Sequence, residues 1–190
     1  NVKITFKPAP SNTGLVFIRE DIDGDNSIEA HIKYISNTDR GTNLDNGSFR
    51  IHTSEHVLAA LTGLGIDNCY ICLNGAEVPI MDGSSKFFIQ AIEKAKIVDQ
   101  NALREEFFPN EKISYMCKES GSKISVIPHE RYSVDTKVDY DTKVLGTQTA
   151  ILEDISEFKN EISSARTFSF LHELETLLEN GLIKGGDLNN

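Results

Sequence analysis

The stretch HTSEHVLAALTGLGID, residues 52–67, puts an acidic side chain directly beside an imidazole at the start of an apolar run. Ser54 suits the N-cap of a helix, and Glu55 then lies in the first turn, where the helix dipole favours a carboxylate. Apolar residues follow at helical spacing: Val57, Leu58, Leu61 and Leu64. The stretch therefore predicts an amphipathic helix that begins after Ser54 and is ended by Gly63 and Gly65.

The adjacent pair Glu55 and His56 has two interpretations. A zinc hydrolase needs three protein ligands, an open position for water, and a carboxylate that takes a proton from that water. Neighbouring helical residues point about 100° apart, so a helix start can aim His56 at a metal while Glu55 reaches the water beside it. The simpler interpretation is a capped helix whose first two polar side chains are solvated.

The same residues also spell H-x-x-E-H from His52 to His56, which is the signature of inverzincin-type metalloproteases. That signature requires both histidines on one helical face, four residues apart. Residues 51–53 have an extended pattern, so a helix that begins after Ser54 leaves His52 outside it. The protease is kept as an alternative hypothesis that depends on where the helix begins.

The remaining pattern predicts a mixed fold. Strands are expected at 2–9, 13–21, 28–36, 69–73, 112–118, 122–129, 131–140 and 145–154. Helices are expected from the turn at 81–84 to Ala95, at 154–164, and near 170–180. The sequence therefore predicts an α+β class with two similar domains, residues 1–105 and 106–190, each a helix pair packed on a mostly antiparallel sheet.

The composition excludes several classes of protein. The 190 residues carry a formal net charge of −10, which argues against a broad nucleic-acid surface. No apolar run approaches the ~18 residues of a membrane span. Three cysteines are an odd number, so a reducing, cytoplasmic setting fits better than a disulfide framework. Cys69 and Cys72 lie three apart on an expected strand and face opposite sides, which favours buried thiols over a redox or metal pair.

A second candidate for chemistry is Arg166-Thr167-Phe168. The hydroxyl of Thr167 can donate a hydrogen bond to an oxyanion, or it can be an ordinary solvated loop group. An apolar helical face follows, made of Leu171, Leu174, Leu177 and Leu178. Such a face is typical of a core, and a groove for an acyl chain has the same composition.

Three segments together resemble one enzyme family. They are TSEHVLAALTGLGIDN (53–68), EVPIMDGSSKFFIQAI (77–92) and ARTFSFLHELETLLENGLIKGG (165–186). In this order and spacing they are similar to the zinc-dependent UDP-3-O-acyl-N-acetylglucosamine deacetylases of lipid A biosynthesis. The resemblance implies a layered α+β sandwich of two domains with the site between them, in a cytoplasmic, monomeric enzyme. It implies Zn²⁺ as cofactor and a UDP-acylated amino sugar as substrate, with no nucleic-acid partner.

The resemblance also implies residue roles. Glu55 matches the general base, His56 the first zinc ligand, and Thr167 the threonine that supports the oxyanion. The passage for the acyl chain matches Phe168, Leu174, Ile183 and Gly186. Tyr140 aligns loosely with an aromatic residue that meets the uracil ring.

The chain also departs from the family pattern. The H-K-x-x-D segment with the other two zinc ligands, the later histidine that acts as general acid, and a G-x-G-L-H segment near the start do not occur. The chain is therefore expected to be a fragment truncated at both ends and inactive alone. For the complete protein the expectation is hydrolysis of the substrate acetamide to acetate and the free amine, the committed step of lipid A biosynthesis. A non-catalytic, substrate-binding fragment is the further alternative.

Overall fold

The structure, a computed structural model, describes residues 2–38 and 41–170. The described chain forms two compact units, one of residues 2–102 with 158–170 and one of residues 103–157. Helices and antiparallel strands occur together, which confirms the predicted α+β class. The division into domains 1–105 and 106–190 stays a prediction, and the helix expected near 170–180 lies almost wholly outside the described residues.

The first unit is built on a four-stranded sheet of order β1-β7-β2-β3. Its strands are β1 (Ile4–Pro8), β2 (Leu15–Arg19), β3 (Ser27–Glu29) and β7 (Cys69–Leu73). The outer strands lie antiparallel to their neighbours, whereas β2 and β7 are parallel. A parallel pair requires a crossover connection, and here the connection contains helix α1 (Glu55–Gly63).

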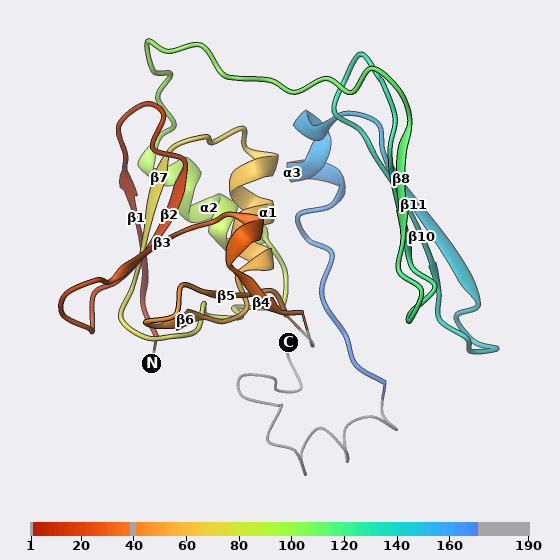
Figure 1. Cartoon of the computed structure of the whole chain (residues 1–190), viewed down its shortest axis with the longest axis horizontal. Helices are drawn as coiled ribbons and strands as arrows, with labels where there is room; N and C mark the ends of the chain where they lie inside the picture. The colour runs from red at the N-terminus through yellow and green to blue at the C-terminus, as the bar shows by residue number, and fades with distance from the viewer. Residues whose placement is uncertain (1, 39–40, 171–190) are drawn as a thin grey trace. The chain divides into compact units, whose positions relative to one another are not determined.

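Helices α1 and α2 (Lys86–Ala95) cover one face of this sheet (Figure 1). Both layers contribute fully buried apolar side chains: Phe17 and Ile71 from the sheet, and Val57, Leu61 and Phe88 from the helices. Burial of one such side chain stabilises the fold by about 1.5–3 kcal/mol. This packing fixes the first turns of both helices on the sheet, as the expected helix pair on a mostly antiparallel sheet requires.

The single strand predicted at 28–36 is wrong. The chain forms β3, then a short 3-10 helix η1 (Ile32–Tyr34), then strand β4 (Ile35–Asn37). The ring nitrogen Nδ1 of His31 accepts a hydrogen bond from the Lys33 amide at 3.0 Å, and this bond caps η1. A side chain that caps a turn competes with the ladder of a strand, so the strand pattern is interrupted at His31.

A second, three-stranded sheet leads into α1. Strand β4 pairs antiparallel with β5 (Asn43–Asp45), which pairs antiparallel with β6 (Arg50–Ile51). Leu44 and Ile51, opposite each other in the register, are both buried. The buried pair of Leu44 and Ile51 therefore fixes the position of the chain immediately before α1.

After residue 157 the chain returns to the first unit through α3 (Phe158–Glu161), which is shorter than the helix expected at 154–164. The buried ring of Phe158 lies so close to Gly63 that a Cβ added at this glycine would overlap the ring. The last turn of α1 therefore requires glycine for the close approach of α3.

The second unit contains two antiparallel hairpins. They are β8 (Ile113–Met116) with β9 (Lys123–Val126), and β10 (Val134–Asp139) with β11 (Thr147–Leu152). In the first hairpin, Ile113 pairs with Val126 and Tyr115 with Ile124, so four exposed apolar side chains share one face.

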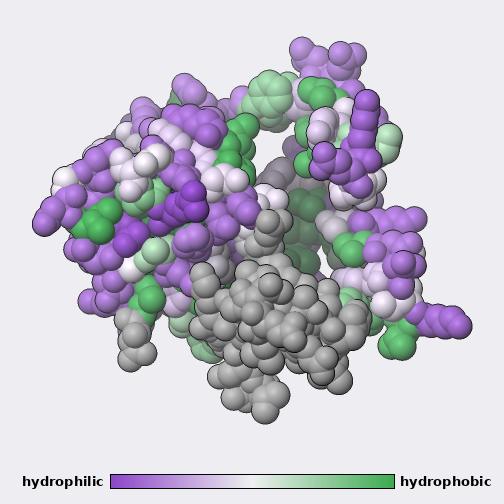
Figure 2. All heavy atoms as spheres, turned by 60° about the horizontal axis from the view of Figure 1, so that its bottom comes forward, coloured by the Kyte–Doolittle hydropathy of each residue, from purple (hydrophilic) through white to green (hydrophobic). Residues whose placement is uncertain are grey.

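On the face drawn in Figure 2, the described residues are mostly hydrophilic, with apolar groups scattered among them. Among the residues that the structure describes, no helix has both the length and the apolar character that crossing a membrane requires.

Candidate functional site

The site begins at the first turn of α1, where Glu55 and His56 are the first two helical residues. The Oε1 atom of Glu55 lies 3.8 Å from Nε2 of His56, and their side chains are 35% and 18% exposed. Both groups are therefore more enclosed than two solvated side chains at a surface helix start. A carboxylate and an imidazole nitrogen at this separation leave room for a small ligand or a water molecule beside both.

The Glu55 carboxylate is oriented by the loop at residues 41–42. Its Oε2 atom accepts a hydrogen bond of 2.7 Å from the backbone amide of Thr42. The neighbouring Gly41 is close as well, because a Cβ built there would lie 3.5 Å from Oε1 of Glu55. One carboxylate oxygen is thus held by the loop, and the other is turned toward His56.

Ser54 occupies the predicted N-cap position, but the expected capping bond is not made. Its backbone has φ −79° and ψ −16°, a helical conformation that carries its hydroxyl away from the free amides of the first turn. The hydroxyl donates instead to the carbonyl of Thr42 at 2.8 Å, and Ser54 N donates to the same carbonyl at 3.0 Å. Thr42 is therefore bonded to both Ser54 and Glu55, which fastens the loop to the helix start.

The turn before α2 also contacts this helix start. The hydroxyl of Ser85 donates to the carbonyl of His56 at 2.9 Å. Two residues earlier, the carbonyl of Gly83 accepts from the amide of Thr167 at 2.8 Å. Nε of Arg166 also donates to the carbonyl of Asp82 at 2.7 Å. Three segments far apart in the sequence, at 54–56, 82–85 and 166–167, are thereby joined.

Two residues next to these segments have a left-handed backbone that non-glycine residues rarely adopt. They are Thr53 with φ 59° and Met81 with φ 56°. The Thr53 hydroxyl donates to Oε1 of Glu77 at 3.1 Å, which helps to hold this unusual conformation. Backbone strain of this kind costs about 1–3 kcal/mol and clusters at functional sites. Two of the five non-glycine residues with a positive φ in the described part of the chain therefore flank this region.

His52 lies outside α1, as the sequence pattern predicted. It forms an isolated bridge with Glu77, and its Nδ1 lies 3.1 Å from the side-chain oxygen of Asn43. The inverzincin signature needs both histidines on one helix face. The helix begins three residues after His52, so this chain does not present that arrangement.

The other residues expected at the site lie in different parts of the chain. Phe168 is 54% exposed, and its ring packs edge-on against Phe170 with centroids 5.4 Å apart. Tyr140 belongs to the second compact unit, where its amide donates to Gly146 at 3.0 Å. Its expected contact with uracil stays a prediction. Three expected contacts of the acyl chain lie outside the described residues: Leu174, Ile183 and Gly186.

Within 2–38 and 41–170, no three His, Cys, Asp or Glu side chains are grouped so that they could hold a metal ion. The pair Cys69 and Cys72 is buried and free, in agreement with the structural interpretation of C-x-x-C. Burial raises the pKa of the Cys69 thiol to about 11, which disfavours the thiolate that metal binding needs.

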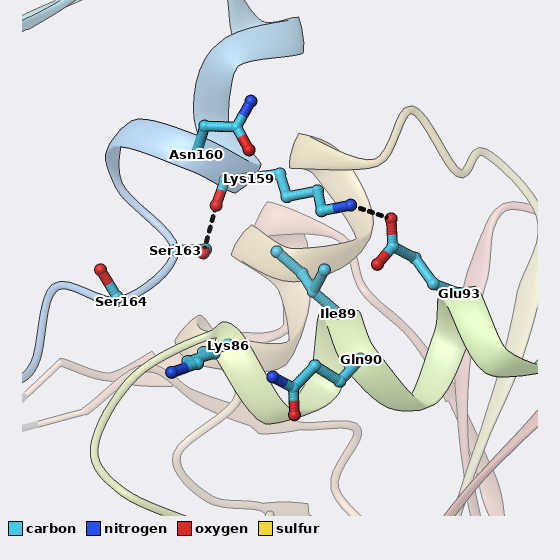
Figure 3. A pocket seen from close by; sticks show the side chains of 8 residues that line it. All are labelled: Lys86, Ile89, Gln90, Glu93, Lys159, Asn160, Ser163 and Ser164. Carbon is cyan, nitrogen blue, oxygen red and sulfur yellow. Dashed lines mark hydrogen bonds and ion pairs between the residues drawn. The ribbon is translucent and has the colours of Figure 1, made fainter.

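A shallow pocket of about 300 Å³ lies between α2 and α3 (Figure 3). Its lining consists of Lys86, Ile89, Gln90, Glu93, Lys159, Asn160, Ser163 and Ser164. An ion pair of 2.5 Å between Lys159 and Glu93 closes one side. None of the residues expected to act on a substrate lines it.

Comparison with known proteins identifies relatives over the whole chain. The family model described as LpxC, UDP-3-O-acyl N-acetylglycosamine deacetylase, matches residues 1–190. The bifunctional enzyme LpxC/FabZ of Bacteroides thetaiotaomicron is 42% identical over 190 residues, which are 100% of this chain and 41% of that protein. The UDP-3-O-acyl-N-acetylglucosamine deacetylases of Chromohalobacter salexigens and Coxiella burnetii are 38% and 39% identical, and the matches cover 100% of this chain and 63% of each. The chain thus spans less than two thirds of the length of these relatives.

Proposed function

Because this chain belongs to the UDP-3-O-acyl N-acetylglycosamine deacetylase family, we propose that the complete protein hydrolyses the acetamide of UDP-3-O-acyl-N-acetylglucosamine. The products are acetate and the free amine, and the reaction is the committed step of lipid A biosynthesis. The observation that carries the proposal is the pair Glu55 and His56, held side by side at a helix start by the Thr42 amide and the Ser85 hydroxyl.

Glu55 acts as the general base in this proposal. Its Oε2 atom is occupied by the Thr42 amide, so Oε1 is the oxygen that takes the proton from the attacking water. That atom faces the imidazole at 3.8 Å, close enough for one water molecule to touch both groups. A positioned base of this kind contributes about 10²–10⁴-fold to a rate.

Thr167 supports the oxyanion that forms when water adds to the acetamide carbonyl. Its backbone is fixed to Gly83, and a Cβ at Gly83 would lie 3.3 Å from its methyl group. The residue is exposed, so its hydroxyl is accessible for a hydrogen bond to the oxyanion. Removal of one such donor typically costs about 10²–10³-fold in rate.

Zinc is part of the proposal. A bound zinc ion polarises a carbonyl and lowers the pKa of its water. The partly buried imidazole of His56 is a ligand of the type that zinc prefers. It supplies one of the three protein ligands that a catalytic zinc site needs. The described residues contain no cluster of three donors, so the other ligands are expected from elsewhere in the complete protein. This chain alone is accordingly expected to bind zinc weakly and to be inactive.

The substrate is proposed to extend away from the reacting amide in two directions. Phe168, together with Leu174, Ile183 and Gly186, lines the passage of the acyl chain, and the exposed Phe168 ring offers apolar surface to it. Tyr140 meets the uracil ring. The enzyme is proposed to work as a cytoplasmic monomer without a nucleic-acid partner, in keeping with its net charge of −10.

The test uses the complete protein with UDP-3-O-acyl-N-acetylglucosamine and measures acetate release together with zinc content. The wild-type protein is expected to release acetate, and His56→Ala to lose both zinc and turnover. A wild-type protein that contains zinc but releases no acetate would contradict the proposal. Binding of the nucleotide sugar without turnover would favour the non-catalytic alternative.

The protease and deacetylase hypotheses predict opposite effects of His52→Ala and Thr167→Ala on zinc content and activity. A protease that uses His52 and His56 loses its zinc in His52→Ala and keeps its activity in Thr167→Ala. The deacetylase keeps zinc in His52→Ala, because this residue lies outside α1, and loses activity in Thr167→Ala.

A further inference from the structure

Both helices at the candidate site begin with a serine that does not cap its own helix. Ser54 precedes α1 and Ser85 precedes α2, and neither makes a side-chain capping bond. Their backbones are helical, at φ −79° and −83°, whereas a capping residue is typically extended. At α2 the neighbouring Ser84 hydroxyl accepts from the Lys86 amide at 3.2 Å, which leaves the Ser85 hydroxyl for another partner.

The second serine points its hydroxyl at the residue proposed to bind zinc. Ser85 is 6% exposed, and its Oγ donates to the carbonyl of His56 at 2.9 Å, across a sequence separation of 29 residues. A hydrogen bond to this carbonyl restrains the peptide plane after His56, and with it the direction of the Cα–Cβ bond that carries the imidazole.

The same short turn also holds Thr167. Gly83 binds the Thr167 amide at 2.8 Å, and Asp82 stiffens the turn by accepting from the Ser84 hydroxyl at 2.7 Å. A single turn, residues 82–85, is therefore bonded to His56 at one end and to Thr167 at the other. The spacing of these two residues depends on both attachments.

We propose that Ser85 is a positioning residue, whose hydroxyl fixes the direction of the His56 imidazole relative to the turn that holds Thr167. The positioning itself is a property of this chain. Its effect on turnover rests on the proposed deacetylase function, because a small misplacement of a reacting group lowers the rate steeply.

The decisive measurement does not need turnover. In the metal-free complete protein, the ring resonances of His56 are identified in ¹H–¹³C spectra by their loss in His56→Gln. Ser85→Ala is expected to shift them, and Ser85→Thr, which keeps the hydroxyl, to restore them. If Ser85→Ala does not fold, Ser85→Cys replaces it, because a thiol of similar size is a much weaker donor.

Ser163→Ala is the matched control. Ser163 is also 6% exposed and also donates its hydroxyl to a backbone carbonyl, that of Lys159 at 2.5 Å, at the pocket between α2 and α3 (Figure 3). The Ser163→Ala variant therefore removes one buried hydrogen bond that does not involve His56. The proposal is overturned if Ser85→Ala moves the His56 ring resonances no more than Ser163→Ala does.

Kinetics separate this proposal from the proposed function. In an active enzyme, Ser85→Ala is expected to lower kcat about tenfold while KM stays within about twofold, and Ser163→Ala to change neither. Unchanged kcat in Ser85→Ala with unmoved ring resonances refutes positioning and leaves the deacetylase function intact. If the wild-type protein releases no acetate, the proposed function fails, and the ring resonances alone decide the role of Ser85.

Discussion

The Oε2 atom of Glu55 accepts a hydrogen bond of 2.7 Å from the amide of Thr42, thirteen residues earlier in the chain. This bond leaves the other carboxylate oxygen facing His56 at 3.8 Å. The helix start therefore presents one oxygen that is already satisfied and one that is available for a proton.

Replacement of Glu55 separates catalysis from stability. Glu55→Gln keeps an oxygen that can accept from Thr42 but cannot take a proton from water, so acetate release by the complete protein is expected to fall about 10²–10⁴-fold. The unfolding midpoint in urea is expected to change little. The control is Glu93→Gln, which breaks an exposed ion pair with Lys159 and should leave activity unchanged. Full activity in Glu55→Gln would exclude this residue as the base.

Two glycines with similar backbones give a matched test of the Thr167 attachment. Gly83 has φ +81° and Gly47 has φ +89°, so alanine is strained at both by about 1–2 kcal/mol. A Cβ at Gly83 meets the Thr167 methyl at 3.3 Å, whereas a Cβ at Gly47 meets nothing within 4 Å. Similar losses of stability are expected in urea unfolding, but only Gly83→Ala should also lose activity. Equal activity in the two variants would show that the contact between Gly83 and Thr167 does not affect the reaction.

The contact between Gly63 and Phe158 tests the return of the chain to the first unit. Gly63→Ala forces a methyl group into the Phe158 ring and is expected to cost about 1–3 kcal/mol in the free energy of unfolding. Phe158→Ala removes the ring and creates a cavity of its own. In the double variant the overlap is gone, so the effect of Gly63→Ala is expected to vanish there. Additive losses would show that the two residues do not touch.

The ion pair of Arg19 and Asp21 makes a prediction about pH. The guanidinium donates to both oxygens of Asp21 at 2.7 Å, and this hydrogen bonding holds the pKa of the carboxyl below its usual value of 3.8. A lowered pKa stabilises the fold above the unfolded value, and the contribution is lost as the pH falls through the folded value. The advantage of the wild type over Asp21→Asn in urea unfolding is therefore expected to be full at pH 7 and to shrink below about pH 4. An advantage independent of pH would contradict the ion pair.

The three cysteines are expected to differ in reactivity. Burial raises the pKa of Cys69 to about 11 and also raises that of Cys72, so at pH 8 only about a thousandth of the Cys69 thiol is ionised. A hydrogen bond with the Ser120 side chain lowers the pKa of the less buried Cys117. An aromatic disulfide reagent should therefore label one thiol quickly and two only on unfolding. The fast phase should disappear in Cys117→Ser, and a second fast thiol in that variant would contradict the buried C-x-x-C.

Local pattern predicted the parts of the site that a single segment determines. The start of α1 at Glu55 and the position of His52 outside it followed from the apolar spacing and from the polar residues before it. The Thr42 amide and the Ser85 hydroxyl could not be found in this way, because their partners are 13 and 29 residues distant and only the packed fold brings them together.

Side chains that compete with the backbone explain the errors. His31 caps a 3-10 turn and so interrupts an otherwise regular strand pattern. Ser54 has the residue type of a cap but bonds to Thr42 instead. In both cases the residue type was informative about local hydrogen bonding, but the partner depended on structure beyond the segment.

The first unit is assembled from two stretches separated by residues 103–157. During synthesis, the last turn of α1 leaves the ribosome well before Phe158 is made. At roughly 5–20 residues per second, this delay lasts on the order of ten seconds. Until then the surface of α1 around Gly63 lacks its cover by Phe158, so the first unit is completed only after residues 103–157 have been made.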